Sequence, residues 1–413
     1  MGFIVSGTKS FRKATLSLFA GGFVTFAILY STQPLLPVFT DAFHVLPASA
    51  SLTLSLTTGV LAVTLLFSSL ISERWGQKKV MAISLFLSAI MAILTAFAPS
   101  FSILVILRIV QGIALAGLPS IAMAYVDDEF DARSLGTAMG LYVSGTTLGG
   151  MSGRIIVGTI SDFFSWQVAL GAVGLISLLF AVWFWIGLPE PVHFVKKKVP
   201  VSEVFEPLLQ HLKSVNLLCL FGIAFFLMGG FVTLYNYIGY QLIRPPYSLS
   251  QAAIGWIFAV YLCGTFSSAY MGKLADTKGK SGVLVTSMSL MLTGLLLTLV
   301  PLLLVKIIGI ALFTFGFFGS HSIASGWVGR FSGAHAAQAA SLYLFFYYAG
   351  SSLIGTFGGT IWHFLGWEGI VLLISMCIGS ALALEAVLVH HEHDMQNRLP
   401  DRSIPHPFHT IKK

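Results

Sequence analysis

The chain is a succession of long apolar runs separated by short polar segments. The runs lie near residues 14–36, 50–71, 79–99, 101–125, 134–160 and 167–188, and then near 215–240, 250–272, 282–302, 305–328, 337–361 and 367–389. Each is close to the roughly 20 residues that an α-helix needs to cross a bilayer. The pattern predicts an all-α membrane protein with twelve transmembrane helices in two six-helix bundles.

The longest polar connector divides the runs into two sets. It contains Lys196, Lys197 and Lys198 among three prolines. The first run extends through Pro34 and Pro37 without a small-residue cleavage site, so we interpret it as a retained span and not as a signal peptide. We predict a tail at 1–13, a bundle at 14–188, a linker at 189–214, a bundle at 215–389 and a second tail at 390–413.

Composition excludes an ordinary soluble protein. Charged residues make up 9% of the chain and hydrophobic residues 56%, whereas charged residues are about 25% of a typical globular domain. The net charge of +7 is spread over short loops, which indicates a topology signal and no nucleic-acid partner. The cysteines, Cys219, Cys263 and Cys377, lie in apolar runs and imply no disulfide framework.

Basic residues indicate how the chain is oriented. Of the 23 Lys and Arg residues, nearly all lie in alternate loops and in the two tails. The opposite loops hold only Arg244 and Lys306, and Arg108 and Arg154 fall within predicted spans. Because cytoplasmic loops are enriched in Lys and Arg, we expect both termini to be cytoplasmic.

The two sets of runs repeat one another. The pentapeptide GGFVT at 21–25 recurs at 229–233, and Gly76 recurs as Gly279. Around the fifth and eleventh runs, seven residues match in one register, namely Tyr142, Gly149, Gly158, Thr159, Ile160, Phe163 and Trp166 with Tyr343, Gly350, Gly359, Thr360, Ile361, Phe364 and Trp367. Apolar bias does not explain matches that include Trp, Tyr and Thr. We infer a duplication that produced two parallel, pseudo-symmetric halves.

Duplicated bundles of this kind are typical of secondary transporters that rock about a cavity at the membrane midplane. Small residues in the fifth and eleventh runs favour close helix packing, and we single out Gly145, Gly149, Gly150, Gly350 and Gly359. Such glycines serve interfaces that slide or interfaces that are static. The sequence leaves both open.

The loop after the second run resembles the signature of the major facilitator superfamily, G-x-L-x-D-R-x-G-R-K. The matching positions are Ser69, Ile71, Glu73, Arg74, Gly76, Gln77 and Lys78, and those of the second copy are Gly272, Leu274, Ala275, Asp276, Gly279 and Lys280. Ser, Glu and Gln replace three residues of the pattern in the first copy. The likeness extends over about 14–389 and implies the twelve-span fold of this superfamily.

Charged residues of these loops form a candidate cytoplasmic gate. The gate residues are Glu73, Arg74, Gly76, Lys78, Asp127, Asp128, Asp276 and Gly279. We hypothesise that the carboxylates pair with the basic residues as a latch that shuts the cytoplasmic side and opens during turnover. The alternative is a set of screened loop charges, each pair contributing about 0 to 1 kcal/mol.

A second motif lies in the fourth run, where Leu104, Arg108, Gln111 and Gly112 resemble the L-x-x-x-R-x-x-Q-G of the proton-coupled exporters in this superfamily. An arginine within an apolar run must face a wet cavity, a partner or the interface. The resemblance implies that Arg108 takes part in proton coupling. A titratable neighbour is missing from the sequence pattern. The candidates to substitute for it are His321 in the tenth run and a carboxylate at the rim, and the alternative for His321 is a packed, hydrogen-bonded role.

A third motif, Gly145, Thr146, Gly149 and Gly150 in the fifth run, resembles the G-P-x-x-G-G of antiporters, with Thr in place of Pro. Arg154 follows on the same helix. We predict that Arg108 and Arg154 line the central cavity and favour a substrate of anionic or polyhydroxylated character. The alternative is an ion pair between Arg154 and Asp162.

Other polar residues fall at similar depth. Gln33 and Tyr30 in the first run, Asn236 and Tyr237 in the seventh, and Gln111 in the fourth are candidates for the cavity wall. Amides need hydrogen-bond partners in a membrane, which a cavity or a neighbouring helix supplies. In the eleventh run Tyr343 and Tyr347 are further candidates, with aromatic packing as the alternative.

The resemblance is to the drug-efflux and sugar-efflux type of twelve-span proton antiporter in bacteria. We expect alternating access and proton-coupled efflux of a small molecule by a monomer in the cytoplasmic membrane. An importer of a small anionic or polar solute and a receptor on a transporter scaffold remain alternatives. No motif for an enzyme, a cofactor or a metal stands out, and we interpret His390, His391, Glu392, His393 and Asp394 as part of a solvated tail.

Overall fold

The structure is a computed structural model that describes residues 2–194, 201–333 and 335–397. The first part of the chain forms α1 (Lys9–Tyr30), the 3-10 helix η1 (Gln33–Leu35), α2 (Leu36–Phe43), α3 (Pro47–Trp75), α4 (Gln77–Thr95), α5 (Phe101–Leu115), α6 (Pro119–Glu129), α7 (Leu135–Phe163) and α8 (Trp166–Gly187). The second part forms α9 (Val201–His211), α10 (Val215–Ile243), α11 (Gln251–Ile257), η2 (Phe258–Val260), α12 (Tyr261–Lys278), α13 (Lys280–Leu297), α14 (Leu303–Phe331) and α15 (Ala336–Asn397).

Several predicted spans are broken helices. The first run consists of α1, η1 and α2, and the breaks coincide with Pro34 and Pro37, which lack the N–H that a continuous helix needs. Pro119 begins α6 after a break in the fourth run. Broken helices of this kind expose main-chain groups to a cavity inside a membrane protein.

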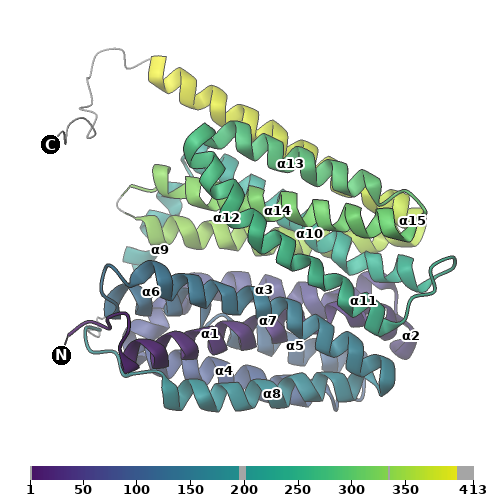
Figure 1. The fold of residues 1–413 in the computed structure, drawn as a ribbon, viewed down its shortest axis with the longest axis horizontal. Helices are drawn as coiled ribbons and strands as arrows, with labels where there is room; N and C mark the ends of the chain where they lie inside the picture. The colour runs from purple at the N-terminus through teal and green to yellow at the C-terminus, as the bar shows by residue number, and fades with distance from the viewer. Residues whose placement is uncertain (1, 195–200, 334, 398–413) are drawn as a thin grey trace.

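Ten helical segments among the described residues are long and apolar enough to cross a membrane. One of them contains two spans, because α15 bends at Gly366, whose φ of 60° and ψ of −147° lie outside the helical region. The glycine-rich α7 is not among the ten, yet it lies parallel to them in Figure 1. Dividing α15 and adding α7 gives the twelve predicted spans in the described part of the chain, and the predicted all-α fold is confirmed.

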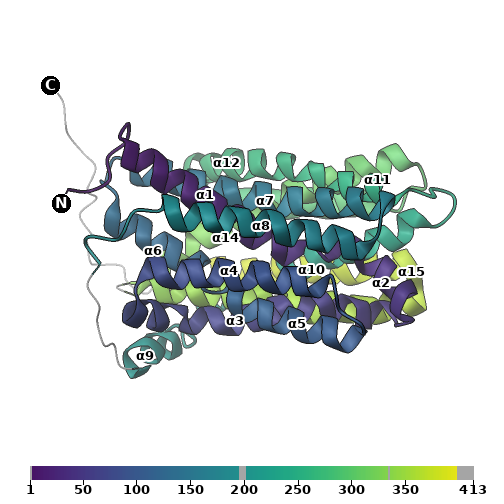
Figure 2. The same ribbon diagram turned by 90° about the horizontal axis from the view of Figure 1, so that it is seen from below.

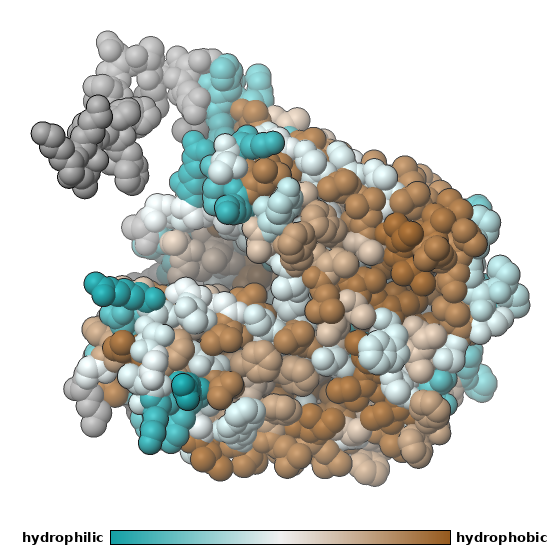
Figure 3. Space-filling model, in the orientation of Figure 1, coloured by the Kyte–Doolittle hydropathy of each residue, from teal (hydrophilic) through white to brown (hydrophobic). Residues whose placement is uncertain are grey.

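The helices form two layers along one long axis. In Figure 1, α1 to α8 occupy one half of the molecule and α10 to α15 the other, and both chain ends lie at the same end. Figure 2 shows the helices running lengthwise from a second direction, with α9 at the end that carries the termini. Brown, apolar residues cover much of the face in Figure 3, and many of the teal residues lie at the ends of the helices. This distribution is typical of a membrane protein.

Matching positions of the two halves have matching structure. Gly76 has φ 96° and ψ 139°, and Gly279 has φ 93° and ψ 142°. Both have a positive φ, which glycine adopts readily because it lacks a Cβ. Both are the N-cap of the following helix. The hydroxyls of Thr25 and Thr233 each donate to the carbonyl four residues earlier in the repeated pentapeptide. The internal repeat is therefore visible in local geometry.

Some segments differ from the sequence-based expectations. The linker predicted at 189–214 contains the helix α9, and the tail predicted at 390–413 begins as helix, because α15 continues to Asn397. Lys306, expected in a loop, lies in the first turn of α14 and is buried. Lys196, Lys197, Lys198 and the basic residues of 398–413 lie outside the described residues.

Candidate functional site

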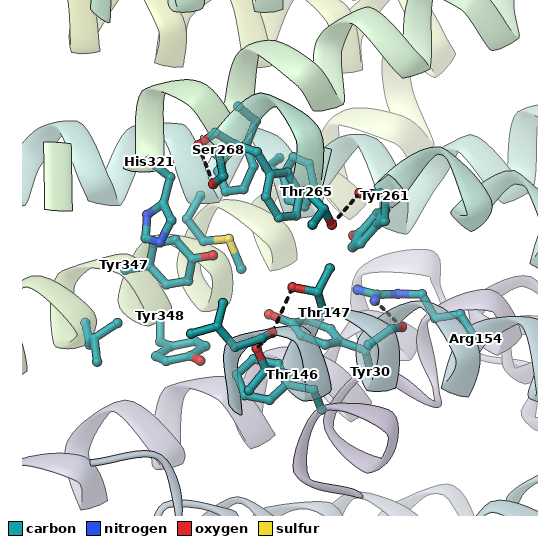
Figure 4. A pocket seen from close by; sticks show the side chains of 18 of the residues that line it. Tyr30, Thr146, Thr147, Arg154, Tyr261, Thr265, Ser268, His321, Tyr347 and Tyr348 are labelled. Carbon is teal, nitrogen blue, oxygen red and sulfur yellow. Dashed lines mark hydrogen bonds between the residues drawn. The ribbon is translucent and has the colours of Figure 1, made fainter. Parts of the chain in front are cut away.

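A cavity of about 350 Å³ lies between the two halves. Its wall comes from α1 and α7 on one side and from α10, α12, α14 and α15 on the other, as Figure 4 shows. The lining residues are Phe26, Tyr30, Val143, Thr146, Thr147, Gly150, Arg154, Met228, Phe231, Tyr261, Thr265, Ser268, Ala269, Phe317, Phe318, His321, Leu344, Tyr347 and Tyr348. The volume lies within the range of small-molecule sites, about 300 to 1,000 Å³.

The cavity is closed at the end of the bundle away from the chain termini. There Gln33 Nε2 donates to Asn236 Oδ1 at 2.8 Å, and the hydroxyls of Thr40 and Tyr240 lie 2.7 Å apart. The backbone N–H of Gln251 donates to Asp162. We refer to these contacts between the halves as the closed end.

Close glycine contacts complete the closed end. A Cβ built on Gly158 of α7 would lie 2.8 Å from Cα of Gly255 in α11, and one built on Gly359 of α15 would lie 2.3 Å from Cα of Ala48 in α3. Gly158 and Gly359 are equivalent positions of the repeat, and each packs against the opposite half. At the other end Figure 3 shows the surface hollowed between the halves, so the cavity faces the side of the termini.

Arg154 lies in the cavity wall, as predicted from its place in an apolar run. Its side chain is 1% exposed. Nε donates to Gln33 Oε1 at 2.7 Å, and Nη1 donates to the carbonyl of Gly150 at 2.6 Å. Cζ lies 4.1 Å from the ring centre of Tyr30, 4.8 Å from Phe258 and 4.9 Å from Tyr261. Asp162 bonds to Gln251 instead of forming the alternative ion pair.

Gln33 joins Arg154 to the closed end. Its side chain accepts from Arg154 and donates to Asn236 of the other half. Both amides are buried. The amide nitrogen of Asn236 has no hydrogen-bond partner among the described residues. Gln33 and Asn236 thus lie behind the cavity wall, next to Arg154, and link the two halves.

Arg108 does not line the cavity, and it lies apart from Arg154. Its Nε donates to the carbonyl of Thr53 at 2.7 Å, and its Nη atoms donate to the carbonyls of Ile28 at 3.1 Å and Leu29 at 2.7 Å and to the side chain of Gln111. α1 ends at Tyr30, where helical carbonyls lack partners. Arg108 supplies a partner to the carbonyl of Leu29 and a further donor to that of Ile28, which also accepts from Ser31. Its positive charge suits a helix C-terminus.

His321 lines the cavity on the opposite half. Its Nδ1 lies 3.0 Å from the hydroxyl of Tyr343, and its ring centre lies 4.7 Å from that of Tyr347. Phe317 stacks on the other side at 6.0 Å with an interplanar angle of 5°. Tyr347 lines the cavity as well, whereas Tyr343 lies behind His321. The structure therefore brings His321, Tyr343 and Tyr347 together.

Tyr237 was predicted to line the cavity but lies outside its wall, and Tyr261 and Phe231 line the cavity without having been predicted. Tyr237 donates to the carbonyl of Gly355 at 2.7 Å and packs beside Gly359 near the closed end. Tyr261 and Phe231 were not among the predicted residues. Tyr261 carries no charge and belongs to no motif, and Phe231 stood out only as part of the repeated GGFVT. Both line the cavity.

The candidate gate residues lie at the end that carries the termini, and their described contacts stay within one half. Lys78 Nζ lies 2.9 Å from Glu190 Oε1 and 5.2 Å from the ring centre of Trp185. Gln77 Nε2 donates to Asp128 at 2.8 Å. Glu73 and Arg74 lie in the last turn of α3, Asp127 is exposed at the end of α6, and Asp276 is exposed near the end of α12. The latch stays a prediction.

Three of the predicted packing glycines lie between the first and fifth spans of a half. A Cβ on Gly145 or Gly149 would lie 2.3 Å and 2.2 Å from the carbonyl oxygens of Phe19 and Phe23 in α1. A Cβ on Gly350 would lie 2.0 Å from that of Phe225 in α10. Gly150 instead lies beside Arg154 in the cavity wall.

The family model of the Major Facilitator Superfamily matches residues 18–244. The chain belongs to this superfamily. The MFS-type transporter YybF of Bacillus subtilis is 49% identical to it over 94% of this chain and 96% of the relative. The inner membrane transport protein YnfM of Escherichia coli is 42% identical over 92% of this chain and 93% of the relative. The predicted resemblance to the superfamily is thereby confirmed.

Solved structures of the superfamily share the fold at low sequence identity. A peptide transporter POT in complex with sulfate superposes with a TM-score of 0.75 at 12% identity, covering 94% of this chain and 95% of the other. The nucleoside transporter NupG superposes with a TM-score of 0.74 at 15% identity, covering 91% and 99%. This chain is a multi-pass membrane transporter of the superfamily, which agrees with the prediction of a protein other than an enzyme.

Proposed function

We propose that this transporter exports a small molecule by alternating access, in exchange for protons. The observation that carries the proposal is the cavity between the halves, closed at one end by contacts between the halves and facing the termini at the other. With both termini in the cytoplasm, as the distribution of Lys and Arg indicates, the cavity faces the cytoplasm. A cytoplasm-facing cavity is the loading state of an exporter and also the release state of an importer. The likeness of Gly145, Gly149 and Gly150 to the antiporter pattern supports export.

We assign the coupling proton to His321. Among the residues that line the cavity in the described part of the chain, His321 is the only one that ordinarily titrates near neutral pH. Its contact with Tyr343 orients the ring, and its contact with Tyr347 places it at the cavity surface. Protonation there places a positive charge in the cavity on the half opposite Arg154, so that occupancy of the proton site changes the charge that a substrate meets.

The test is flux into proteoliposomes with an imposed pH gradient. The substrate is first taken from a growth screen that compares deletion with overexpression across dyes, antibiotics, sugars and amino acids. An exporter accumulates it in vesicles with an acidic lumen when the cytoplasmic face points outward, and a protonophore abolishes accumulation. His321→Gln removes gradient-driven accumulation and retains substrate exchange, whereas His363→Gln, at an exposed position of α15, behaves as wild type.

Each alternative has its own outcome in this assay. An importer accumulates the compound with the opposite gradient, and a receptor on this scaffold binds it without flux in either direction. Equal accumulation by His321→Gln and wild type rules out the assigned proton carrier while leaving export in place.

A further inference from the structure

The cavity holds one unbalanced positive charge. Arg154 is 1% exposed, and the ion pairs found in the described part of the chain do not include it. None of the residues that line the cavity is an aspartate or a glutamate. Gln33 and Gly150 satisfy two of its N–H groups with neutral acceptors. Burying a charge without a counter-ion is costly, and such residues in membrane proteins mark the path of a charged ligand.

A second polar group beside Arg154 lacks a partner. Tyr261 is 6% exposed and lines the cavity, and its hydroxyl makes no hydrogen bond within the described residues. The ring centre of Tyr261 lies 4.9 Å from Arg154 Cζ. Figure 4 shows Arg154, Tyr30 and Tyr261 gathered at one end of the cavity, from opposite halves of the molecule. Buried hydroxyls nearly always have a partner, so a ligand acceptor is expected here.

Apart from the tyrosines and His321, the rest of the wall is apolar or already satisfied. Phenylalanines of both halves, with Met228 and Leu344, cover it, and the rings of Phe231 and Phe317 stack with centres 3.7 Å apart. The hydroxyls of Thr146, Thr147, Thr265 and Ser268 each donate to a main-chain carbonyl. The Thr and Ser protons are therefore taken, and a sugar would depend on the tyrosine hydroxyls, His321 and Arg154 for its hydrogen bonds. An aromatic or aliphatic body would find complementary surface.

We propose that the transported substrate is a small amphiphilic monoanion. Its carboxylate or equivalent acid group accepts hydrogen bonds from Arg154 and from the Tyr261 hydroxyl, and its apolar body lies on the phenylalanine wall. One acid group is matched by the single arginine, whereas a second would be buried without a partner. This inference rests on the proposed function, in which the cavity between the halves is the transport site.

Binding of matched probes to the purified full-length protein tests the charge requirement. The probes are 4-phenylbutanoate, 4-phenylbutanamide and 4-phenylbutylamine, which share one apolar body, together with decanoate and 1-naphthoate as further acids. Titration calorimetry in nanodiscs is expected to show at least about tenfold tighter binding of the acid than of the amide, because a charge-assisted hydrogen bond is lost in the amide. The amine is expected not to compete.

Variants locate the acid group. Arg154→Gln is expected to bind acid and amide equally, Arg154→Lys to keep part of the preference, and Tyr261→Phe to bind the acid about 3- to 10-fold more weakly while still preferring it to the amide. Arg133→Gln, an exposed arginine outside the cavity, is the matched control. Thermal unfolding of each variant verifies that it is folded.

The inference is overturned if the amide or the amine binds as tightly as the acid, if all three acids fail to bind, or if folded Arg154→Lys and Tyr261→Phe both bind as wild type does. The proposed function fails separately. Flux of a neutral or cationic compound driven by a proton gradient supports the proposed export and contradicts the anionic substrate. Binding of acids that depends on Arg154, without flux in any gradient, supports the anion site and contradicts the proposed export.

Discussion

Replacing Gly359 by alanine is expected to open the closed end. A Cβ at this position would lie 2.3 Å from Cα and 2.4 Å from N of Ala48, both main-chain atoms of α3 in the other half. Ordinary contacts begin near 3.4 Å, so the two helices must separate by about 1 Å. No flexible side chain is available to absorb this displacement.

The size of the effect follows from the cost of overpacking. Inserting a methyl group into a packed interface costs about 1 to 3 kcal/mol. In the outward-open conformation that the proposed alternating access requires, α3 and α15 part at this end, so the cost is expected to fall only on the conformation described here. The equilibrium between the two conformations then shifts by about 5- to 150-fold toward the state open at this end.

Pulsed electron resonance between two spin labels measures the shift. Labels at Ala42→Cys in α2 and Ser250→Cys before α11 report on the closed end, in a background in which Cys219, Cys263 and Cys377 are replaced by serine. Gly359→Ala is expected to populate a longer distance. Gly379→Ala, in the same helix with nothing within 4 Å of its Cβ, serves as the control. An unchanged distance distribution in Gly359→Ala contradicts the argument.

Two further predictions separate the roles of the buried polar residues. Gln33→Glu places a carboxylate 2.7 Å from Arg154 Nε, where it competes with a bound acid for the arginine. Binding of 4-phenylbutanoate in calorimetry is expected to weaken at least about tenfold, and binding of the amide is expected not to change. Unchanged binding of the acid contradicts the anion site. Arg108→Gln leaves the carbonyl of Leu29 without its side-chain donor, at about 1 to 3 kcal/mol, whereas the carbonyls of Ile28 and Thr53 keep the hydroxyls of Ser31 and Thr57 as donors. The variant is expected to lower the midpoint of thermal unfolding while the acid-over-amide preference persists. An unaltered midpoint contradicts the structural role.

The fold is predictable from the sequence because its main determinants are local. Apolar runs of sufficient length give the helices, and glycine at positions 76 and 279 gives the turns with positive φ. The internal repeat then predicts two halves of matching structure. The continuation of α15 to Asn397 was not predictable from hydropathy, since polar residues extend a helix beyond the apolar segment without changing its geometry.

The site was only partly predictable, because the same physical rule has two solutions. An arginine in an apolar run needs polar partners, and the rule placed both Arg108 and Arg154 in the cavity. Arg154 is there, whereas Arg108 finds its acceptors at the broken end of α1. Only the fold decides between a cavity and a helix end. Tyr261 was missed because the lack of a partner for its hydroxyl is a property of the packed structure.

The two arginines act on the same broken helix from opposite sides. Arg108 donates to the carbonyls of Ile28 and Leu29 near the end of α1. Tyr30 and Gln33 follow shortly after. The ring of Tyr30 lies against Arg154, and the side chain of Gln33 accepts from Arg154 Nε. The position of the break therefore sets the surroundings of Arg154. Gln33 also bonds to Asn236 across the interface. If the proposed acid substrate competes with Gln33 for Arg154, it is expected to weaken this contact between the halves, which would link substrate binding to opening of the closed end through one amide.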